Sequence, residues 1–158
     1  MNIRFLIPGK CREKYIIDGQ NEYLKRLSKY GKISLVSLEE ESLPSLPSDA
    51  QIKKALSIEA DRALKQIKDD ECLFLVDIHA KNPSTKTLAD KIKEKMKTNG
   101  NLVFLVGSSY GLDDKLRKRA NYSFSLGEMT YTHYMAMMLV IEQVYRSMKI
   151  IRGEAYDK

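Results

Sequence analysis

The sequence predicts an α/β fold in which helices flank a mostly parallel β-sheet. Short apolar segments of roughly six residues alternate with longer amphipathic segments, a pattern typical of strands and helices that take turns around such a sheet. The chain has 158 residues, the length of one domain that can bury a core without disulfides or metals. We therefore expect residues 1–158 to form a single domain.

Five segments have the composition of strands. Their apolar and β-branched residues alternate or run continuously between turn residues. These segments are residues 3–7, 32–38, 72–78, 102–106 and 122–126. The third has a nearly continuous apolar run, so we expect it to be central in the sheet.

Five further segments have the periodicity of helices. They are residues 13–30, 48–68, 84–98, 113–120 and 132–151. Gly31 is placed to end the first, Ser48 or Asp49 can cap the second, and Ser84 can cap the third. Residues 39–48 form a polar loop with two prolines, which we expect to be the most mobile segment.

The last predicted helix is unusual because residues 134–141 are apolar on every side. A helix without a polar face must be covered on several sides, and a domain of this size has few elements to cover it. The sequence therefore predicts a homodimer with an isologous contact on this helix. Burial within one monomer is the alternative.

The net charge of +6 is concentrated in one part of the chain. Residues 81–119 carry ten basic and four acidic side chains, whereas residues 1–80 carry 13 of each and residues 120–158 carry four of each. The clustered basic residues are Lys91, Lys93, Lys95, Lys97, Lys115, Arg117, Lys118 and Arg119. A local basic surface suits a polyanion, because neutralised phosphates release counterions. A pair of solvated helix faces is the alternative.

Composition disfavours several classes of protein. No apolar run approaches the roughly 20 residues that span a bilayer, and the N-terminus lacks the pattern of a secretion signal, so a cytoplasmic location is expected. Cys11 and Cys72 form no CxxC pair, and His79 and His133 are too scattered for a metal cluster. We expect no metal site and no membrane segment.

The loop at residues 106–111 lies between an expected buried strand and an expected helix, the position at which open α/β sheets bind ligands. It matches neither the dinucleotide nor the triphosphate fingerprint, and such a turn needs small residues for steric reasons as well. No Ser or Cys has a recognisable relay, so hydrolase chemistry is disfavoured. His133, at the head of the last helix, could position a substrate or serve packing.

Three segments resemble the ribosomal RNA large subunit methyltransferase H family. They are KCREKYIIDGQNEYLKRL from Lys10, the glycine turn GSSYGL from Gly107, and SLGEMTYTHYMAMMLVIEQVYRSMKIIRGEAYDK from Ser125. The resemblance covers essentially the whole chain. It implies a SPOUT-type fold with a C-terminal trefoil knot, and two subunits that build the active site together.

The resemblance also implies an activity. Members use S-adenosylmethionine to methylate N3 of a pseudouridine in the large-subunit rRNA (23S) of assembled ribosomes. The matched cofactor positions are Val76, Gly107, Leu126, Gly127, Glu128, Met129, Thr130 and Tyr131. Arg146 would stabilise developing negative charge, and Tyr156 would position the base or relay its proton. His133 matches a family histidine at the head of the last helix.

Four residues depart from the family pattern near these positions. Asp157 stands in place of a histidine beside the catalytic positions, Ser108 of a glycine, Thr132 of a proline and Met137 of an arginine. Met137 is expected to lack a phosphate or base contact, and Ser108 to narrow the cofactor site. The alternative is therefore a divergent paralogue that binds RNA or ribosomes with reduced, absent or altered activity. Methylation of a different RNA base is a third hypothesis.

Overall fold

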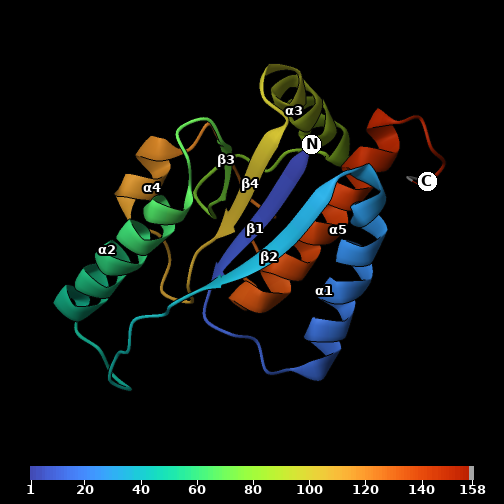
Figure 1. Ribbon diagram of the computed structural model, residues 1–158. Helices are drawn as coiled ribbons and strands as arrows, with labels where there is room; N and C mark the ends of the chain where they lie inside the picture. The colour runs from blue at the N-terminus through green and yellow to red at the C-terminus, as the bar shows by residue number, and fades with distance from the viewer. Residues whose placement is uncertain (157–158) are drawn as a thin grey trace.

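Five strands form one sheet in which every neighbouring pair is parallel. The computed structural model describes residues 1–156. The strand order is β2-β1-β4-β3-β5, and Figure 1 labels the first four of these strands. The strands are β1 (Asn2–Pro8), β2 (Lys32–Leu38), β3 (Cys72–Val76), β4 (Asn101–Val106) and β5 (Tyr122–Phe124). The parallel α/β architecture predicted from the sequence is confirmed.

The helices divide between the two faces of the sheet, as Figure 1 shows. One face carries α1 (Lys14–Leu27), α3 (Thr85–Thr98) and α5 (His133–Ile151), and the other carries α2 (Asp49–Gln66) and α4 (Asp114–Arg119). The crossovers from β1 to β2 and from β3 to β4 run toward the β2 edge of the sheet. Those from β2 to β3 and from β4 to β5 run toward the β5 edge. Because parallel crossovers are right-handed, the direction of each step decides which face its helix covers.

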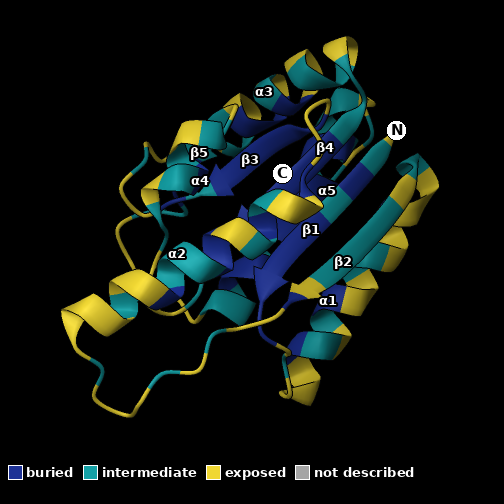
Figure 2. Ribbon diagram, turned by 60° about the vertical axis from the view of Figure 1, so that its left-hand side comes forward, coloured by how far each residue is buried: buried dark blue, intermediate teal, exposed yellow. Residues whose placement is uncertain are grey.

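Alternating strand residues supply two hydrophobic cores. The Phe104 ring stacks between two others, with its centroid 5.5 Å from that of Phe5 and 4.8 Å from that of Phe74. These three side chains pack toward α1, α3 and α5. Leu6 and Leu105 point to the opposite face and pack under α2 and α4. The three inner strands are buried along most of their length (Figure 2). Strand β3 lies inside the sheet, between β4 and the edge strand β5, but the central strand is β4.

The helix starts agree with the capping residues seen in the sequence. Ser48 and Gln51 form a capping box, in which the Ser48 hydroxyl accepts the Gln51 N–H at 3.2 Å and the Gln51 side chain accepts the Ser48 N–H at 2.8 Å. The Ser84 hydroxyl accepts the Thr87 N–H at 3.1 Å. Each cap satisfies an N–H that has no partner within its helix.

Some predicted ends were wrong by a few residues. The first helix stops at Leu27 and continues as a 3₁₀ turn, η1 (Ser28–Tyr30), which Gly31 ends. The third strand stops at Val76 instead of residue 78, because the chain turns at Asp77: the Ala80 N–H donates to the Asp77 carbonyl at 3.0 Å and the His79 N–H donates to the Asp77 carboxylate at 3.1 Å. Strand β5 ends at Phe124 instead of residue 126. In the part of the chain that the structure describes, no helix is both long and apolar enough to cross a membrane.

The apolar helix α5 packs against the sheet between α1 and α3. Ala136, Met137, Val140 and Ile141 are buried within the single subunit. A strip of half-buried side chains that includes Met135, Met138 and Leu139 remains. Intramolecular burial thus accounts for much of the apolar character of α5, and the homodimer stays a prediction.

Candidate functional site

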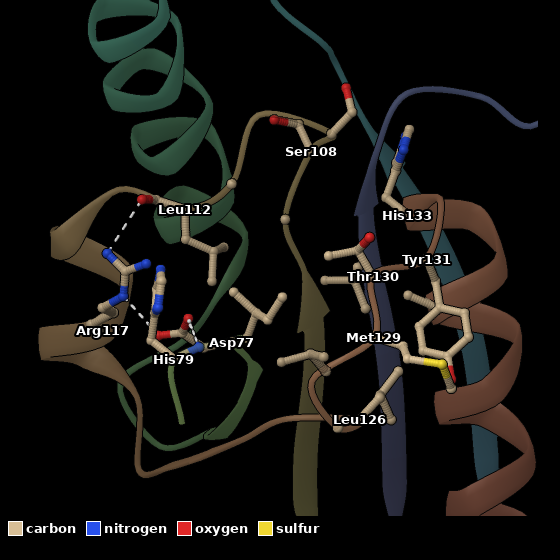
Figure 3. Close-up of a pocket in the computed structure, with 18 residues that line it drawn as sticks. Asp77, His79, Ser108, Leu112, Arg117, Leu126, Met129, Thr130, Tyr131 and His133 are labelled. Carbon is tan, nitrogen blue, oxygen red and sulfur yellow. Dashed lines mark hydrogen bonds and ion pairs between the residues drawn. The ribbon is translucent and has the colours of Figure 1, made fainter. Parts of the chain in front are cut away.

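A cavity of about 240 Å³ opens at the carboxyl edge of the sheet (Figure 3). Val76 and Val106, the last residues of β3 and β4, line one side of it. Residues from the segment 126–131 and the head of α5 line another side. Loops after parallel strands converge at this edge, and ligands bind there in open α/β sheets. The cavity is therefore the first candidate for a binding site.

Seven of the eight positions matched to cofactor binding line this one cavity, although they come from three separate parts of the chain. They are Val76, Gly107, Leu126, Gly127, Met129, Thr130 and Tyr131. Glu128 is exposed and is absent from the lining. The assignment of these residues to a cofactor stays a prediction, but the fold brings them together.

Gly107 is required by its own loop. A Cβ added there would lie 2.6 Å from the Gly111 carbonyl oxygen and 2.6 Å from Leu112 Cδ2. The Gly111 N–H donates to the Ser108 carbonyl at 3.0 Å, which closes the turn, and Gly111 has a φ of 111°. The glycines thus allow a tight turn that could not form with larger residues.

The segment that follows β5 is fastened to the segment that follows β3. The Ser125 N–H donates to the Lys81 carbonyl at 2.9 Å, and the Gly127 N–H donates to Ser125 Oγ at 3.3 Å. Gly127 has a φ of 111°, a conformation that favours glycine. Beyond this anchor, the Met129 and Tyr131 side chains are exposed while still lining the cavity. The cavity wall therefore has a fixed base and apolar side chains at its mouth.

A charged wall, which was not predicted from the sequence, lies on the side of the cavity formed by α4. Arg117 Nε donates to the buried Asp77 Oδ2 at 2.7 Å, and the His79 N–H donates to Asp77 Oδ1 at 3.1 Å. Burial raises the pKa of Asp77, but these hydrogen bonds and the Arg117 charge outweigh burial and leave the pKa lowered. The signal in the sequence was a single aspartate inside the otherwise apolar segment 72–78.

His133 lies in the cavity lining, which favours the positioning role over packing alone. Its Nε2 is buried and has no hydrogen-bond partner among the described residues. Burial lowers the pKa of His133, although the charge of Glu40 opposes the effect. Because Nε2 is buried, contact between this nitrogen and a ligand stays a prediction.

Arg146 and Tyr156 lie together, but not at the cavity. Arg146 Nη2 donates to Glu142 Oε1 at 2.8 Å, and the Tyr156 hydroxyl donates to the same oxygen at 3.3 Å. The Arg146 guanidinium also lies 4.7 Å from the centre of the Tyr156 ring. Burial, followed by the hydrogen bond and charge of Tyr23, raises the pKa of Tyr156 to about 12. We call Glu142, Arg146 and Tyr156 the tail cluster.

Length along α5 separates the tail cluster from the cavity. His133 begins the helix and lines the cavity, whereas Arg146 lies near the opposite end. At about 1.5 Å per residue, the helix places these two residues roughly 20 Å apart along its axis. The fold therefore does not bring the predicted catalytic residues Arg146 and Tyr156 to the cavity of the same subunit.

The departures from the family pattern have different structural settings. Met137 is 0% exposed and lies in the core, which is consistent with the expectation that it contacts no phosphate or base. Thr132 has a φ of −58°, an angle that proline also adopts. The backbone conformation at this position is therefore the same for threonine and for the family's proline. Ser108 lines the cavity and has a buried Oγ without a partner in residues 1–156. Asp157 lies outside the described residues.

The two basic stretches do not form one surface. Helices α3 and α4 cover opposite faces of the sheet, so the lysines of α3 are separated from the basic residues of α4. Several α4 cations also have intramolecular partners, since Lys115 pairs with Asp61 at 2.7 Å and Arg119 donates to the Lys68 and Glu71 carbonyl oxygens. The basic residues of α3 and α4 are close in sequence but not in space, because successive crossovers run in opposite directions along the sheet.

No group of three or more His, Cys, Asp or Glu residues within 1–156 is arranged to hold a metal ion.

Comparison with known proteins shows likeness over the full length of the chain. A family model described as "Predicted SPOUT methyltransferase" matches residues 1–157. The ribosomal RNA large subunit methyltransferase H of Enterococcus faecalis is 36% identical over 159 residues, and that of Listeria monocytogenes is 38% identical over 160 residues. Both matches cover 100% of this chain and 100% of the relative.

Solved structures show the same fold at low identity. A ribosomal RNA small subunit methyltransferase E from Neisseria gonorrhoeae, bound to S-adenosyl methionine, has a TM-score of 0.52 and 12% identity. The match covers 96% of this chain and 66% of that protein. A tRNA (m1G37) methyltransferase from Aquifex aeolicus has a TM-score of 0.51 and 16% identity, with 92% and 70% coverage. Likeness at these identities concerns the fold alone.

Proposed function

Because the chain belongs to the ribosomal RNA large subunit methyltransferase H family of SPOUT methyltransferases, we propose that it methylates large-subunit rRNA with S-adenosylmethionine. The proposed target is N3 of a pseudouridine (of the position 1915 type) in assembled ribosomes, which places the enzyme in the cytoplasm. The observation that carries the proposal is the cavity at the carboxyl edge, where seven of the eight matched cofactor positions meet.

The cavity residues fit such a cofactor. Val76, Val106 and Leu126 offer an apolar lining for the adenosine, and the glycines leave backbone groups accessible. The charged wall opposite can accommodate the amino-acid end. When bound, the cofactor supplies an electrophilic methyl group on a sulfonium, and the protein's contribution is to hold that group in line with the nucleophile.

The tail cluster is suited to the pseudouridine. N3 must lose its proton as it attacks the methyl group, so negative charge develops on the base. The Arg146 guanidinium, held by Glu142, can stabilise that charge. With its pKa raised to about 12, Tyr156 is a neutral phenol at neutral pH, so it would position the base or relay the proton instead of acting as a phenolate.

A second subunit would bring the two halves of the site together. The tail cluster lies about 20 Å along α5 from the cavity of its own subunit. We propose a homodimer with its contact on the half-buried apolar strip of α5, which would bring the tail cluster of one subunit to the cavity of the other. The C-terminal trefoil knot implied by the family resemblance is part of the same proposal.

The direct test is methyl transfer from labelled S-adenosylmethionine to ribosomes that lack the modification. We expect label at N3 of one pseudouridine in the large-subunit rRNA. Absence of transfer by folded, cofactor-saturated protein would exclude this activity. Label in other RNA, without label in ribosomes, would favour the hypothesis of a different base.

A paralogue that binds RNA or ribosomes with little or no catalysis is the second candidate. Asp157 motivates it because an anion replaces the family's imidazole directly after Tyr156 in the sequence. Ser108 contributes because it lines the cavity at a position where the family has a glycine. Calorimetry separates the candidates, since tight binding of S-adenosylmethionine argues against a role in binding alone. If Asp157 is the defect, Asp157→His should raise turnover; no gain would direct attention to Ser108.

A further inference from the structure

Arg117 is the one positively charged guanidinium in the cavity lining. It belongs to α4, outside the segments that carry the family resemblance to the cofactor site. Its Nε is held by Asp77 at 2.7 Å, and its Nη1 makes only a long contact of 3.4 Å with the Leu112 carbonyl oxygen. Among the described residues, Nη2 has no hydrogen-bond partner. The guanidinium is therefore fixed at one edge and has N–H donors available at another.

The position of Arg117 is well defined. Asp77 is 5% exposed and directly follows β3, so its carboxylate is fixed to the rigid sheet. The His79 N–H binds the second oxygen of the same carboxylate, which orients it further. Figure 3 shows Arg117 and His79 on the same side of the cavity as Asp77, opposite Met129 and Tyr131. An arginine held through Nε in this way is preorganised to bind an anion through its other nitrogens.

We propose that Arg117 binds the carboxylate of the methionine moiety of S-adenosylmethionine. The inference rests on the proposed cofactor. Of the groups in that cofactor, only the carboxylate is an anion, and an arginine fork matches its geometry. The apolar lining from Val76, Val106 and Leu126 suits the adenosine instead. The distribution of charge in the cavity thus assigns the amino-acid end of the cofactor to the side of α4.

Two ligands that differ by one group test this assignment. S-adenosylhomocysteine has the carboxylate, and its decarboxylated analogue keeps the thioether and the amine without it. Calorimetry gives the dissociation constant of each ligand for the wild type and for Arg117→Met. We expect the substitution to weaken binding of S-adenosylhomocysteine by about tenfold or more, the range of a lost charge-assisted hydrogen bond, and to change binding of the analogue by no more than about twofold.

Control variants separate a direct contact from a structural effect. Arg117→Lys keeps a cation for Asp77 but lacks the fork, so it should also weaken S-adenosylhomocysteine selectively. Lys118→Met removes the same charge from an exposed position outside the cavity and should leave both affinities unchanged.

Three results would overturn the inference. Equal weakening of both ligands by Arg117→Met would mean that Arg117 only maintains the shape of the cavity. Unchanged affinities would mean that it makes no contact with the ligand. If the wild type binds neither S-adenosylmethionine nor S-adenosylhomocysteine, the proposed function itself fails, and this outcome is distinct because it appears before any substitution.

Discussion

At the scale of single residues, the cavity combines groups whose roles can be separated by substitution. Gly107 keeps the turn tight, His133 presents an unpaired nitrogen, and Arg117 presents fixed N–H donors. Each lies on a different element, and each has a distinct physical reason to be where it is.

Gly107→Ala should destabilise the protein and weaken cofactor binding. The new Cβ would approach the Gly111 carbonyl oxygen to 2.6 Å, and because backbone must move, the cost should be about 1–3 kcal/mol. Urea unfolding measures the change in free energy of unfolding. Ser109→Ala in the same loop, where the side chain is exposed, is the matched control. Equal stability of the Gly107→Ala variant and the wild type would show that the turn is looser than described.

His133 should make stability depend on pH near neutrality. Burial lowers its pKa in the folded protein, so the unfolded chain binds the proton more readily. The folded state is therefore favoured most above the unfolded pKa of about 6.5, and stability is lost as the pH falls from there through the folded pKa. His133→Gln should reduce this loss when urea unfolding is measured between about pH 8 and pH 5. His79→Gln provides the comparison, and an unaltered pH profile for His133→Gln would contradict the account.

At the scale of elements, the carboxyl ends of β3 and β4 and the segment after β5 create the site. The hydrogen bonds from Asp77 to Phe124 and from Ser125 to Lys81 tie these segments together. Helix α2 packs against α4, where Lys115 donates to Ser57 and pairs with Asp61. Stability of α2 should therefore affect the whole domain.

Ser48→Ala should cost about 1 kcal/mol of unfolding free energy. The substitution removes the acceptor for the Gln51 N–H and breaks the capping box of α2. Urea unfolding gives the value, with Ser45→Ala, an exposed serine in the same loop, as the control. A loss no greater than that of the control would mean that the cap contributes nothing.

The elements were predictable from local signals, and their ends were less so. Ser48 and Ser84 mark helix starts because capping is a contact between near neighbours in sequence. Strand β3 ends at Val76 because Asp77 begins a turn, and the apolar Ile78 hides this turn in the sequence. The pairing of Asp77 with Arg117 spans 40 residues, so no local pattern reveals it. The burial of Met137 likewise depends on how α5 packs.

At the scale of the whole molecule, the SPOUT-type fold expected from the sequence is confirmed by the parallel sheet and by the solved structures that share it. The sheet order also explains why the positive charge is dispersed over two faces.

The half-buried strip on α5 is the contact that we propose for a second copy. Analytical ultracentrifugation should show a dimer, and Met138→Glu should weaken it by placing a charge in the apolar contact. A monomer at all concentrations would exclude the composite site.

Complementation between two inactive variants tests whether the cavity of one subunit works with the tail cluster of the other. Thr130→Trp fills the cavity at an exposed position, and Arg146→Met removes the guanidinium. Each variant alone should fail to methylate ribosomes. In a mixed dimer one composite site carries both changes and the other carries neither, so a random mixture should regain about a quarter of wild-type activity. A mixture as inactive as its components would show that both groups must come from the same chain, and would contradict the account.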